Sequence, residues 1–473
     1  MTLNLSPQWN RTRLMTLAIV VFGACWILAA VVAITSDPLL GVAIGVAPIG
    51  LYILFSKSWA RTLIVVAGGL FVLGSSSDVS ATKLVYSGLL VLCAGVSAFR
   101  LLRDPPTWVG PFRPLVGFGL ALAAVLFVSY FASPSGADLS TFARQSIFYL
   151  ILIAAPVIGL DSGRDLTPNA VYKIVWVAGI IASIGFATDW LERRNVSSLD
   201  VGQFVLSSLI LPGFAFSLAL VLLARARGPV AKLPWLALAL VVPIAMLVTG
   251  TRTNLIIFAA VLAIVGQSKN FRIPARKMLV ILASVLAIGA ALFPIVANAV
   301  ISRPGFIESR IQALLSITSG NAGADQSFSG RQSQYELALD LIAQSPVFGQ
   351  GLGYQLTFTL DTPLLTVVRL GILGTAILLA FVAAIAITFR RATARFGPSV
   401  SYTAWLGLLA IAIANVPFGT PFEDRGFGFT FLLVFVAIAA ELQMHATQEP
   451  DQRQVQPASP KLRIERSSLP LGY

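Results

Sequence analysis

Apolar runs close to twenty residues long recur along almost the whole chain, and short polar connectors separate them. About 20 apolar residues in a helix cross the hydrocarbon core of a bilayer, and only helices or closed barrels cross it without leaving backbone groups unpaired. Barrel strands would instead alternate over about ten residues. The sequence therefore predicts an all-α polytopic membrane protein, and its 57% hydrophobic and 11% charged residues agree with this class.

About twelve to fourteen runs are long enough to be transmembrane helices, the lower number applying if one pair is merged or dropped. The first run follows Arg11 and Arg13 and is long for a signal-peptide core, so we expect a retained anchor. The expected spans are 14–35, 38–56, 62–76, 84–102, 114–132, 145–160, 171–189, 203–224, 233–249, 253–267, 278–300, 363–389, 401–417 and 426–443.

The distribution of positive charge predicts an orientation. With a cytoplasmic N-terminus and alternating spans, most of the 33 Lys and Arg residues fall in inner segments, as the positive-inside rule requires. The net charge of +13 is then explained without a nucleic-acid partner, and both termini are expected in the cytoplasm. The expected organisation is an N-terminal transmembrane bundle (1–300), an outer periplasmic loop (301–362), C-terminal transmembrane helices (363–443) and a disordered cytoplasmic tail (444–473).

One break of about sixty residues, between 302 and 362, interrupts the apolar runs, and a long structured loop in a compact protein is usually functional. Within it, 306–317 and 331–343 have helical apolar spacing, and Ser329 is suited to cap the second helix. Three glycines in 345–354 predict a turn. We expect two short amphipathic helices on the outer membrane surface, followed by a Gly-rich entry into the next span.

Positive residues on the outer side need a specific reason, because the positive-inside rule disfavours them. Several guanidinium groups converging on one face suit a phosphate or diphosphate, which each can grip with two hydrogen bonds. For any single arginine, the alternative is a snorkelling or ion-paired residue. The candidate diphosphate-binding residues are Arg252, Arg331 and Arg369, and further candidates in the last outer loop are Arg425, Glu423 and Asp424.

The only histidine, His445, follows the last span on the cytoplasmic side, so a carboxylate would have to act as a base at an outer site. Asp361 precedes a span and is close in sequence to Arg369, which makes it the candidate catalytic residue. Asp361 would equally suit the N-cap of the following helix, with Pro363 just inside, and the two roles are compatible. No metal-ligand spacing or nucleotide motif occurs, so neither a metal nor a cofactor is expected.

Three stretches resemble the O-antigen ligase and polymerase superfamily of bacterial cell envelopes. Thr249-Gly250-Thr251-Arg252-Thr253 resembles the family's Thr-Gly-Ser-Arg-Gly break. The Gly330-Arg331 helix and the turn 346–353 resemble its outer-loop Arg helix and Gly turn, and 364–374 resembles the start of its next span. The resemblance covers residues 234–379, together with the layout of many spans around one large outer loop.

The resemblance implies a multi-pass protein of the bacterial inner membrane that binds a polyprenyl-diphosphate-linked glycan through Arg252 and Arg331. Membrane lipids and other polysaccharide assembly or export proteins are the further partners it implies. Ligases of the family carry a His-Asn pair near the end of the loop, where this sequence reads Leu360-Asp361-Thr362. The missing histidine favours the exopolysaccharide polymerase branch, where an Asp often takes this place.

We therefore expect a glycosyltransferase that polymerises lipid-linked repeat units at the outer membrane face, in exopolysaccharide or O-antigen biosynthesis. One alternative is a ligase that transfers the glycan to lipid A core. A lipid or polysaccharide transporter or flippase would instead place charges at mid-span and broken helices in paired halves. A non-catalytic partner of an export complex and a peptidoglycan-type polymerase are the remaining alternatives.

Overall fold

The computed structural model describes a set of ranges in which every regular element is a helix, which confirms the all-α prediction. The chain divides into two compact units, 1–63 and 64–473, which are described separately below. The described residues are 31, 48–72, 81–131, 133, 138–193, 208–248, 261–266, 283, 326–356, 360, 362–396, 399–416 and 421–455.

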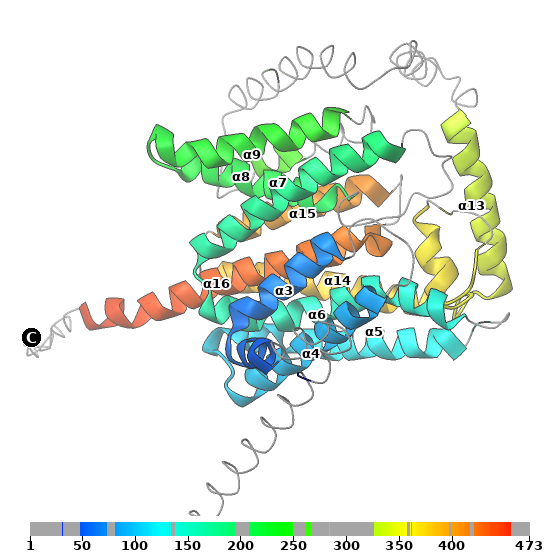
Figure 1. The fold of residues 1–473 in the computed structure, drawn as a ribbon, viewed down its shortest axis with the longest axis horizontal. Coiled ribbons are helices and arrows are strands. Elements are labelled where there is room, and N and C mark those ends of the chain that lie inside the picture. The colour runs from blue at the N-terminus through cyan, green and yellow to red at the C-terminus, as the bar shows by residue number, and fades with distance from the viewer. Residues whose placement is uncertain are drawn as a thin grey trace, which may run out of the picture. The chain divides into compact units, whose positions relative to one another are not determined.

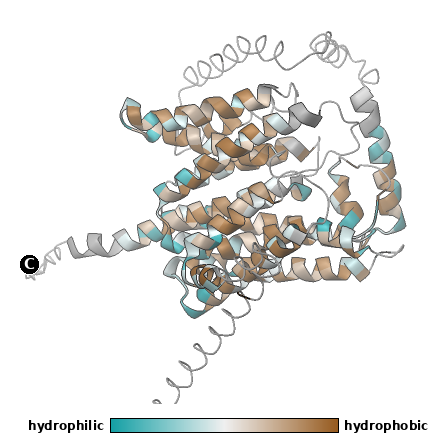
Figure 2. Cartoon of the chain, viewed as in Figure 1, coloured by the Kyte–Doolittle hydropathy of each residue, from teal (hydrophilic) through white to brown (hydrophobic). Residues whose placement is uncertain are grey.

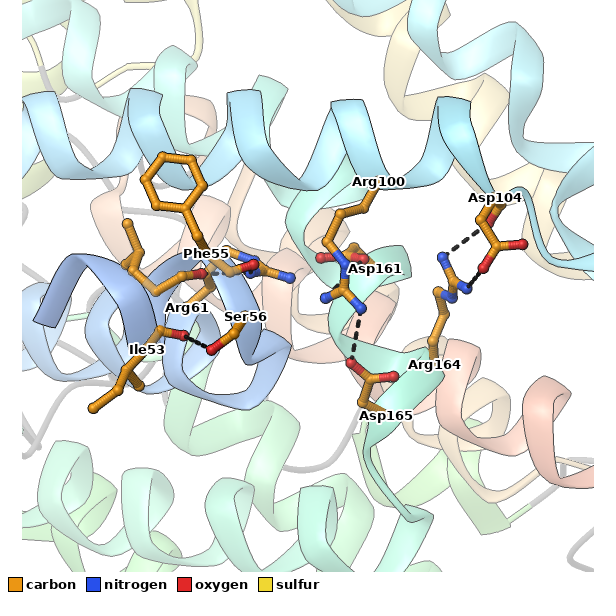
Figure 3. A network of polar contacts seen from close by, with 10 residues as sticks. Ile53, Phe55, Ser56, Arg61, Arg100, Asp104, Asp161, Arg164 and Asp165 are labelled. Carbon is orange, nitrogen blue, oxygen red and sulfur yellow. Dashed lines mark hydrogen bonds and ion pairs between the residues drawn. The ribbon is translucent and has the colours of Figure 1, made fainter. Parts of the chain in front are cut away.

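In the first unit the chain bends sharply. The helix Pro48–Ser56 and the following helix α3 (Ser58–Phe71), which begins in this unit, meet at 114°. Arg61 supports the bend, because its Nη1 donates a hydrogen bond of 2.5 Å to the carbonyl of Leu54 near the end of the first helix (Figure 3). This bond satisfies one of the carbonyls that a helix end leaves without a partner.

This bend lies between the predicted spans 38–56 and 62–76, of which residues 38–47 and 73–76 lie outside the described residues. The 14 residues of α3 rise only about 21 Å, less than the ~30 Å of a bilayer core. Within the described residues, the two helices are apolar enough to cross a membrane only as one bent pair. The polar Ser-Lys-Ser sequence at 56–58 marks the bend, and hydropathy counted over a whole run does not reveal it.

The second unit is a bundle of long apolar helices (Figure 1). Among the described residues, seven helical segments are long and apolar enough to cross a membrane, and α8 and α15 are shorter apolar helices. The seven confirm the predicted spans 84–102, 114–132, 145–160, 171–189, 233–249, 363–389 and 426–443, whereas the helices found in 203–224 and 401–417 are shorter than a span. The elements after α3 are α4 (Ala81–Arg103), η1 (Thr107–Phe112), α5 (Arg113–Phe131), α6 (Leu139–Asp165), α7 (Pro168–Arg193), α8 (Ile210–Arg225), α9 (Pro229–Val248), α13 (Gln326–Gln344), α14 (Leu364–Phe396), α15 (Val400–Asn415), η5 (Pro421–Glu423) and α16 (Arg425–Val455).

The core of this unit is the pair α6 and α16, the helices that pack most extensively against each other. Gly159 and Gly163, four residues apart on α6, allow the close approach. A Cβ at Gly159 would lie 2.4 Å from the Cβ of Phe435, and a Cβ at Gly163 would lie 2.3 Å from the Cβ of Ala439. Helices in a membrane associate through such van der Waals contacts, because burial from lipid supplies no hydrophobic driving force.

Ion pairs join α4 to α6 at one end of the bundle (Figure 3). Arg100 lies 3.5 Å from the buried Asp161 and 3.3 Å from Asp165, and Arg164 lies 2.5 Å from Asp104.

The opposite end of the bundle, where α5 ends and α6, α14 and α16 begin, is called here the loop end. Helix α13 runs across the ends of the long helices there rather than along them (Figure 1), and it carries more polar residues than they do (Figure 2). Its apolar residues Ala338 and Leu341 pack against Leu365 and Val368 of α14. The structure therefore bears out a helix in the predicted 331–343 segment.

The start of α13 differs from the prediction. The helix begins at Gln326, so Ser329 lies inside its first turn and is not the N-cap. Residues 326–331 contain no proline that would stop a helix. Serine prefers a cap position but is tolerated inside a helix, so the surrounding structure can extend the helix past Ser329. The other predicted loop helix, at 306–317, lies outside the described residues.

Candidate functional site

Helix α14 is broken near its start. Gly371 has φ 67° and ψ −177°, a conformation that only glycine adopts without strain, so the segment 364–370 and the remainder of α14 form two helices. The break lies within the predicted span 363–389, which the structure confirms as one membrane-crossing segment. It also frees backbone groups on both sides of Gly371, which need new hydrogen-bond partners.

The glycine turn, residues 345–353, supplies these partners. It packs against the break and makes four backbone hydrogen bonds across it, so the loop and the entry to α14 form one unit. The four bonds are Gln350 N to Val368 O (2.6 Å), Gly351 N to Arg369 O (3.1 Å), Ile372 N to Pro346 O (2.9 Å) and Leu373 N to Val347 O (3.2 Å).

Glycine is required on both sides of this contact. Gly349 has φ 73°, and a Cβ on it would lie 2.5 Å from the backbone nitrogen of Gly371. A Cβ on Gly371 would lie 2.1 Å from the carbonyl oxygen of Val347. The sequence predicted a turn here from its glycines, and the structure confirms it. The contact also explains why the turn and the residues 371–374 belong to one motif.

Helix α6 holds the far side of the glycine turn. The side chain of Gln145 accepts a 2.9 Å hydrogen bond from the backbone N–H of Gly353. Asp138 caps α6, since its carboxylate accepts a 2.8 Å bond from the Thr141 N–H, and its own N–H donates to the Gly353 carbonyl at 3.2 Å. Hydrogen bonds from Ser140 and Thr141 lower the pKa of Asp138, so this cap weakens only as pH falls below the ordinary range of a carboxyl group.

Arg369 lies two residues before the break and is paired with Glu423 of η5. Its Nη1 contacts Glu423 Oε2, and the Tyr149 hydroxyl on α6 donates a 3.1 Å hydrogen bond to Glu423 Oε1. Thr366, one turn before Arg369 on α14, is hydrogen-bonded to the Tyr149 hydroxyl. Three separate elements thus meet in one network, which we call the Arg369 network: Thr366, Arg369, Glu423 and Tyr149.

This network is almost closed to solvent. Tyr149 is 0% and Glu423 3% exposed, and the Arg369 side chain is 14% exposed. A buried charge is costly unless it is paired and hydrogen-bonded, and the pairing here meets that condition for Glu423. The structure therefore brings together two of the predicted candidates, Arg369 and Glu423, from positions 54 residues apart.

Arg144 adds a second cation. It lies on the second turn of α6, is exposed, and is close enough to Arg369 for its like charge to act on it. Sequence analysis did not single out Arg144 or Tyr149. Arg144 was one of several outer cations without a distinguishing motif, and Tyr149 lies in an apolar run where a tyrosine attracts no notice. Only their place on one helix end, beside Arg369, identifies them.

Asp424 lies in the predicted last loop, between η5 and α16, whereas Arg425 lies in a helix. The Asp424 carboxylate accepts bonds of 2.7 Å from the Gly426 N–H and from the Ser208 hydroxyl, so it caps α16 and ties the start of α8 to it. Ser208 also explains why α8 begins at Ile210, later than the predicted 203, because its hydroxyl accepts a bond from the Ile210 N–H at 3.1 Å. Arg425 is the first residue of α16 rather than part of a loop.

The remaining candidates are only partly described. Arg331 lies on α13, the helix that packs on the start of α14, although its side chain is outside the description. Arg252 and Asp361 lie outside the described residues. Helix α14 begins at Leu364 and Pro363 precedes it, so the predicted cap at Asp361 stays a prediction.

Several buried donors at the loop end lack partners among the described residues. Unpaired buried polar atoms are rare in folded proteins and often mark the place of a ligand, an ion or a water molecule. Those close to the glycine turn and the break in α14 are Arg369 Nε, Thr362 Oγ1, Ser133 Oγ and Thr375 Oγ1.

The chemistry of the loop end favours an anion. Beside the break in α14, two guanidinium groups, those of Arg369 and Arg144, accompany the paired carboxylate of Glu423 and several hydroxyl donors, while the carboxylates of Asp138 and Asp424 at the same end cap α6 and α16. Guanidinium groups bind phosphate oxygens well. Among the residues that the structure describes, no group of three or more His, Cys, Asp or Glu could hold a metal ion.

Comparison with known protein families gives one match. Residues 235–363 match the family model Wzy_C, described as O-antigen ligase. The matched segment contains most of α9, all of α13, the glycine turn and the residue before α14. No curated protein is significantly similar to this chain.

Proposed function

We propose that this chain, which matches the O-antigen ligase family model over residues 235–363, is a membrane glycosyltransferase acting on polyprenyl-diphosphate-linked glycans. In this proposal it polymerises oligosaccharide repeat units in exopolysaccharide or O-antigen biosynthesis. The enzyme lies in the bacterial inner membrane with both termini in the cytoplasm, so that the loop end faces the periplasm, as the distribution of Lys and Arg suggests.

The observation that carries the proposal is the cation cluster at the loop end. Arg369 is held beside the glycine turn and Arg144 lies near it. Helix α13, which bears Arg331, packs on the same short segment of α14. Arg252 would complete the site in this proposal. Such a set would bind the donor's diphosphate and stabilise the charge that grows on it as it leaves.

The proposed reaction is a substitution at the anomeric carbon of the donor sugar. The acceptor hydroxyl oxygen forms the new glycosidic bond while the bond between that carbon and the diphosphate oxygen breaks. The diphosphate leaves with the electron pair, neutralised by the arginines, and Asp361 accepts the proton from the acceptor hydroxyl. The apolar helices would hold the prenyl tail.

The position of the break in α14 supports an enzyme over a transporter. Transporter sites formed by broken helices lie near the bilayer midplane. Here the break is at Gly371, only seven residues after the start of a 33-residue helix, and the Arg369 network lies at the same end. A charged network near one end of the bundle, away from mid-span, suits a reaction at the membrane surface.

Ligation is the second candidate function, because the matching family is described as O-antigen ligase. The test that separates the two uses purified protein in lipid nanodiscs with a lipid-linked oligosaccharide, with and without lipid A core. A ladder of polymer without lipid A core supports polymerisation. Product that forms only on lipid A core supports ligation, and the absence of both would refute glycosyl transfer.

Arg331→Ala is expected to abolish polymer in cells while the amount of protein in the membrane stays normal. The reason is that the substitution removes a proposed diphosphate ligand from the first turns of α13, where its loss leaves the packing of Ala338 and Leu341 on α14 intact. Polymer is measured by gel electrophoresis of extracted glycans. Gln332→Ala, at the exposed next position, is the control. Unchanged polymer length and amount in Arg331→Ala would contradict the diphosphate role.

Asp361→Asn is expected to reduce the rate of transfer by about 100-fold or more, in the range that general base catalysis contributes. Binding of the donor should change little, because the arginines make the diphosphate contacts. The measurement is kcat and donor KM with the purified protein. A normal kcat together with a normal donor KM would exclude Asp361 from the mechanism. A normal kcat with a raised donor KM would instead indicate a role in sugar binding.

A further inference from the structure

We propose that Tyr149 and Glu423 are positioning residues, which hold Arg369 by one nitrogen and leave its opposite edge to grip a phosphate oxygen of the donor. The inference rests on the proposed function, since it concerns how that diphosphate is bound. It assigns a role to Tyr149, which belongs to no sequence motif. It also makes Glu423, which the sequence predicted only as a further site candidate, a residue that positions Arg369.

The atoms of the guanidinium group are used unequally. Glu423 takes Nη1, whereas Nε is buried and has no partner among the described residues. Nε–H and one N–H of Nη2 point the same way along one edge of the planar group, and that edge matches two oxygens of a phosphate. The contact with Glu423 therefore occupies the side of Arg369 that a phosphate does not need.

Tyr149 determines where the Glu423 carboxylate lies. Its hydroxyl donates to Oε1 while Arg369 binds Oε2, so the carboxylate is held from both sides. The hydrogen bond between Tyr149 and Thr366 connects the phenol to the same short segment of α14 that carries Arg369. A shift of the phenol would therefore move both the counter-ion and the helix segment.

The glycine turn restrains the same arginine through its backbone. Gly351 N donates to the carbonyl of Arg369 and Gln350 N to that of Val368. Arg369 is thus held at its backbone by the outer loop and at its side chain by α6 and η5. Pre-organisation of this kind lowers the entropic cost of gripping the ligand.

The chain contains a matched pair for comparison. Near the other end of the bundle, the Tyr172 hydroxyl donates a 2.5 Å hydrogen bond to Glu441, which is also buried and also receives bonds from the N–H and hydroxyl of Ser401. Tyr172→Phe removes the same phenol oxygen from an equally buried carboxylate, but far from the loop end.

The experiment compares the wild type with Tyr149→Phe, Glu423→Asp and Tyr172→Phe in nanodiscs. None of these changes alters the net charge, so they test position alone. Two quantities are measured: binding of farnesyl diphosphate by calorimetry, and kcat and KM with the lipid-linked oligosaccharide. We expect Tyr149→Phe to weaken binding and raise donor KM about 5- to 10-fold, as loss of a hydrogen bond to a charged group would.

Glu423→Asp retracts the carboxylate by one methylene and is expected to cost about 10-fold or more in both quantities, because small misplacements of a binding group are costly. Tyr172→Phe should leave both unchanged. Binding and KM at wild-type values in Tyr149→Phe and Glu423→Asp, with only a lower melting temperature, would overturn the positioning role. If the wild type binds farnesyl diphosphate but transfers no glycan, the proposed function fails, and the binding measurements still decide the role of Tyr149.

Discussion

Arg369→Ala is expected to reduce glycan transfer by at least about 100-fold, the loss that follows removal of one group that stabilises transition-state charge. It should also destabilise the protein by about 3–5 kcal/mol, because Glu423, 3% exposed, would be left buried without its cation. The measurements are turnover of lipid-linked oligosaccharide and the melting temperature of the purified protein. Arg144→Ala, at an exposed position, should reduce both glycan transfer and stability less than Arg369→Ala does.

A double variant separates these two effects. The double variant Arg369→Met with Glu423→Gln removes both buried charges, so it should be nearly as stable as the wild type while transfer stays absent. Arg390→Ala, an exposed arginine on the same helix α14, is the control and should behave as the wild type, since Arg391 and Arg395 remain beside it. Recovery of transfer in the double variant would show that Arg369 serves the fold alone.

Gly371→Ala is expected to separate the glycine turn from α14 and to abolish transfer. The left-handed φ of 67° with an extended ψ costs an alanine about 1–3 kcal/mol, and its Cβ would overlap the Val347 carbonyl oxygen at 2.1 Å. Because that oxygen is backbone and accepts a hydrogen bond from Leu373, it cannot move without breaking the contact. Faster amide hydrogen exchange in residues 345–353, together with loss of polymer, is the expected observation.

Gly117→Ala is the matched control for this substitution. Gly117 lies on the exposed face of α5, with nothing within 4 Å of a Cβ, so alanine there should leave activity unchanged and slightly stabilise the helix. Normal exchange protection of residues 345–353 in Gly371→Ala would mean that the turn and α14 are held together by other contacts than those at the break.

Much of the bundle follows from local properties of the sequence. Runs of apolar residues predicted α4 to α9 and α14 to α16, because a helix in a bilayer must satisfy its backbone within its own segment. The glycines of 345–353 predicted a turn from their freedom at positive φ. The bend at 56–58 and the break in α14 at Gly371 were not predicted, since each depends on where a helix bends, and hydropathy averaged over a run does not contain that information.

The candidate site was accessible only in part. The positive-inside rule drew attention to Arg369, and the resemblance to a known family drew attention to Arg331. Nothing in the sequence pairs Arg369 with Glu423, 54 residues away, or Glu423 with Tyr149, 274 residues away. These pairings arise from the packing of α6, α14 and η5, and so does the position of Arg144 beside Arg369.

By itself, the sequence determined that this chain is a helical membrane protein, and it predicted a long loop on the side opposite most of the positive charge. Each residue contributes its own free energy of transfer into hydrocarbon, so these contributions can be added along a chain. Only the tertiary structure decided that the glycine turn closes over a break in α14, and that Tyr149 and Glu423 hold Arg369 there. Such contacts depend on the shapes of side chains on helices distant in sequence, and no local sum contains them.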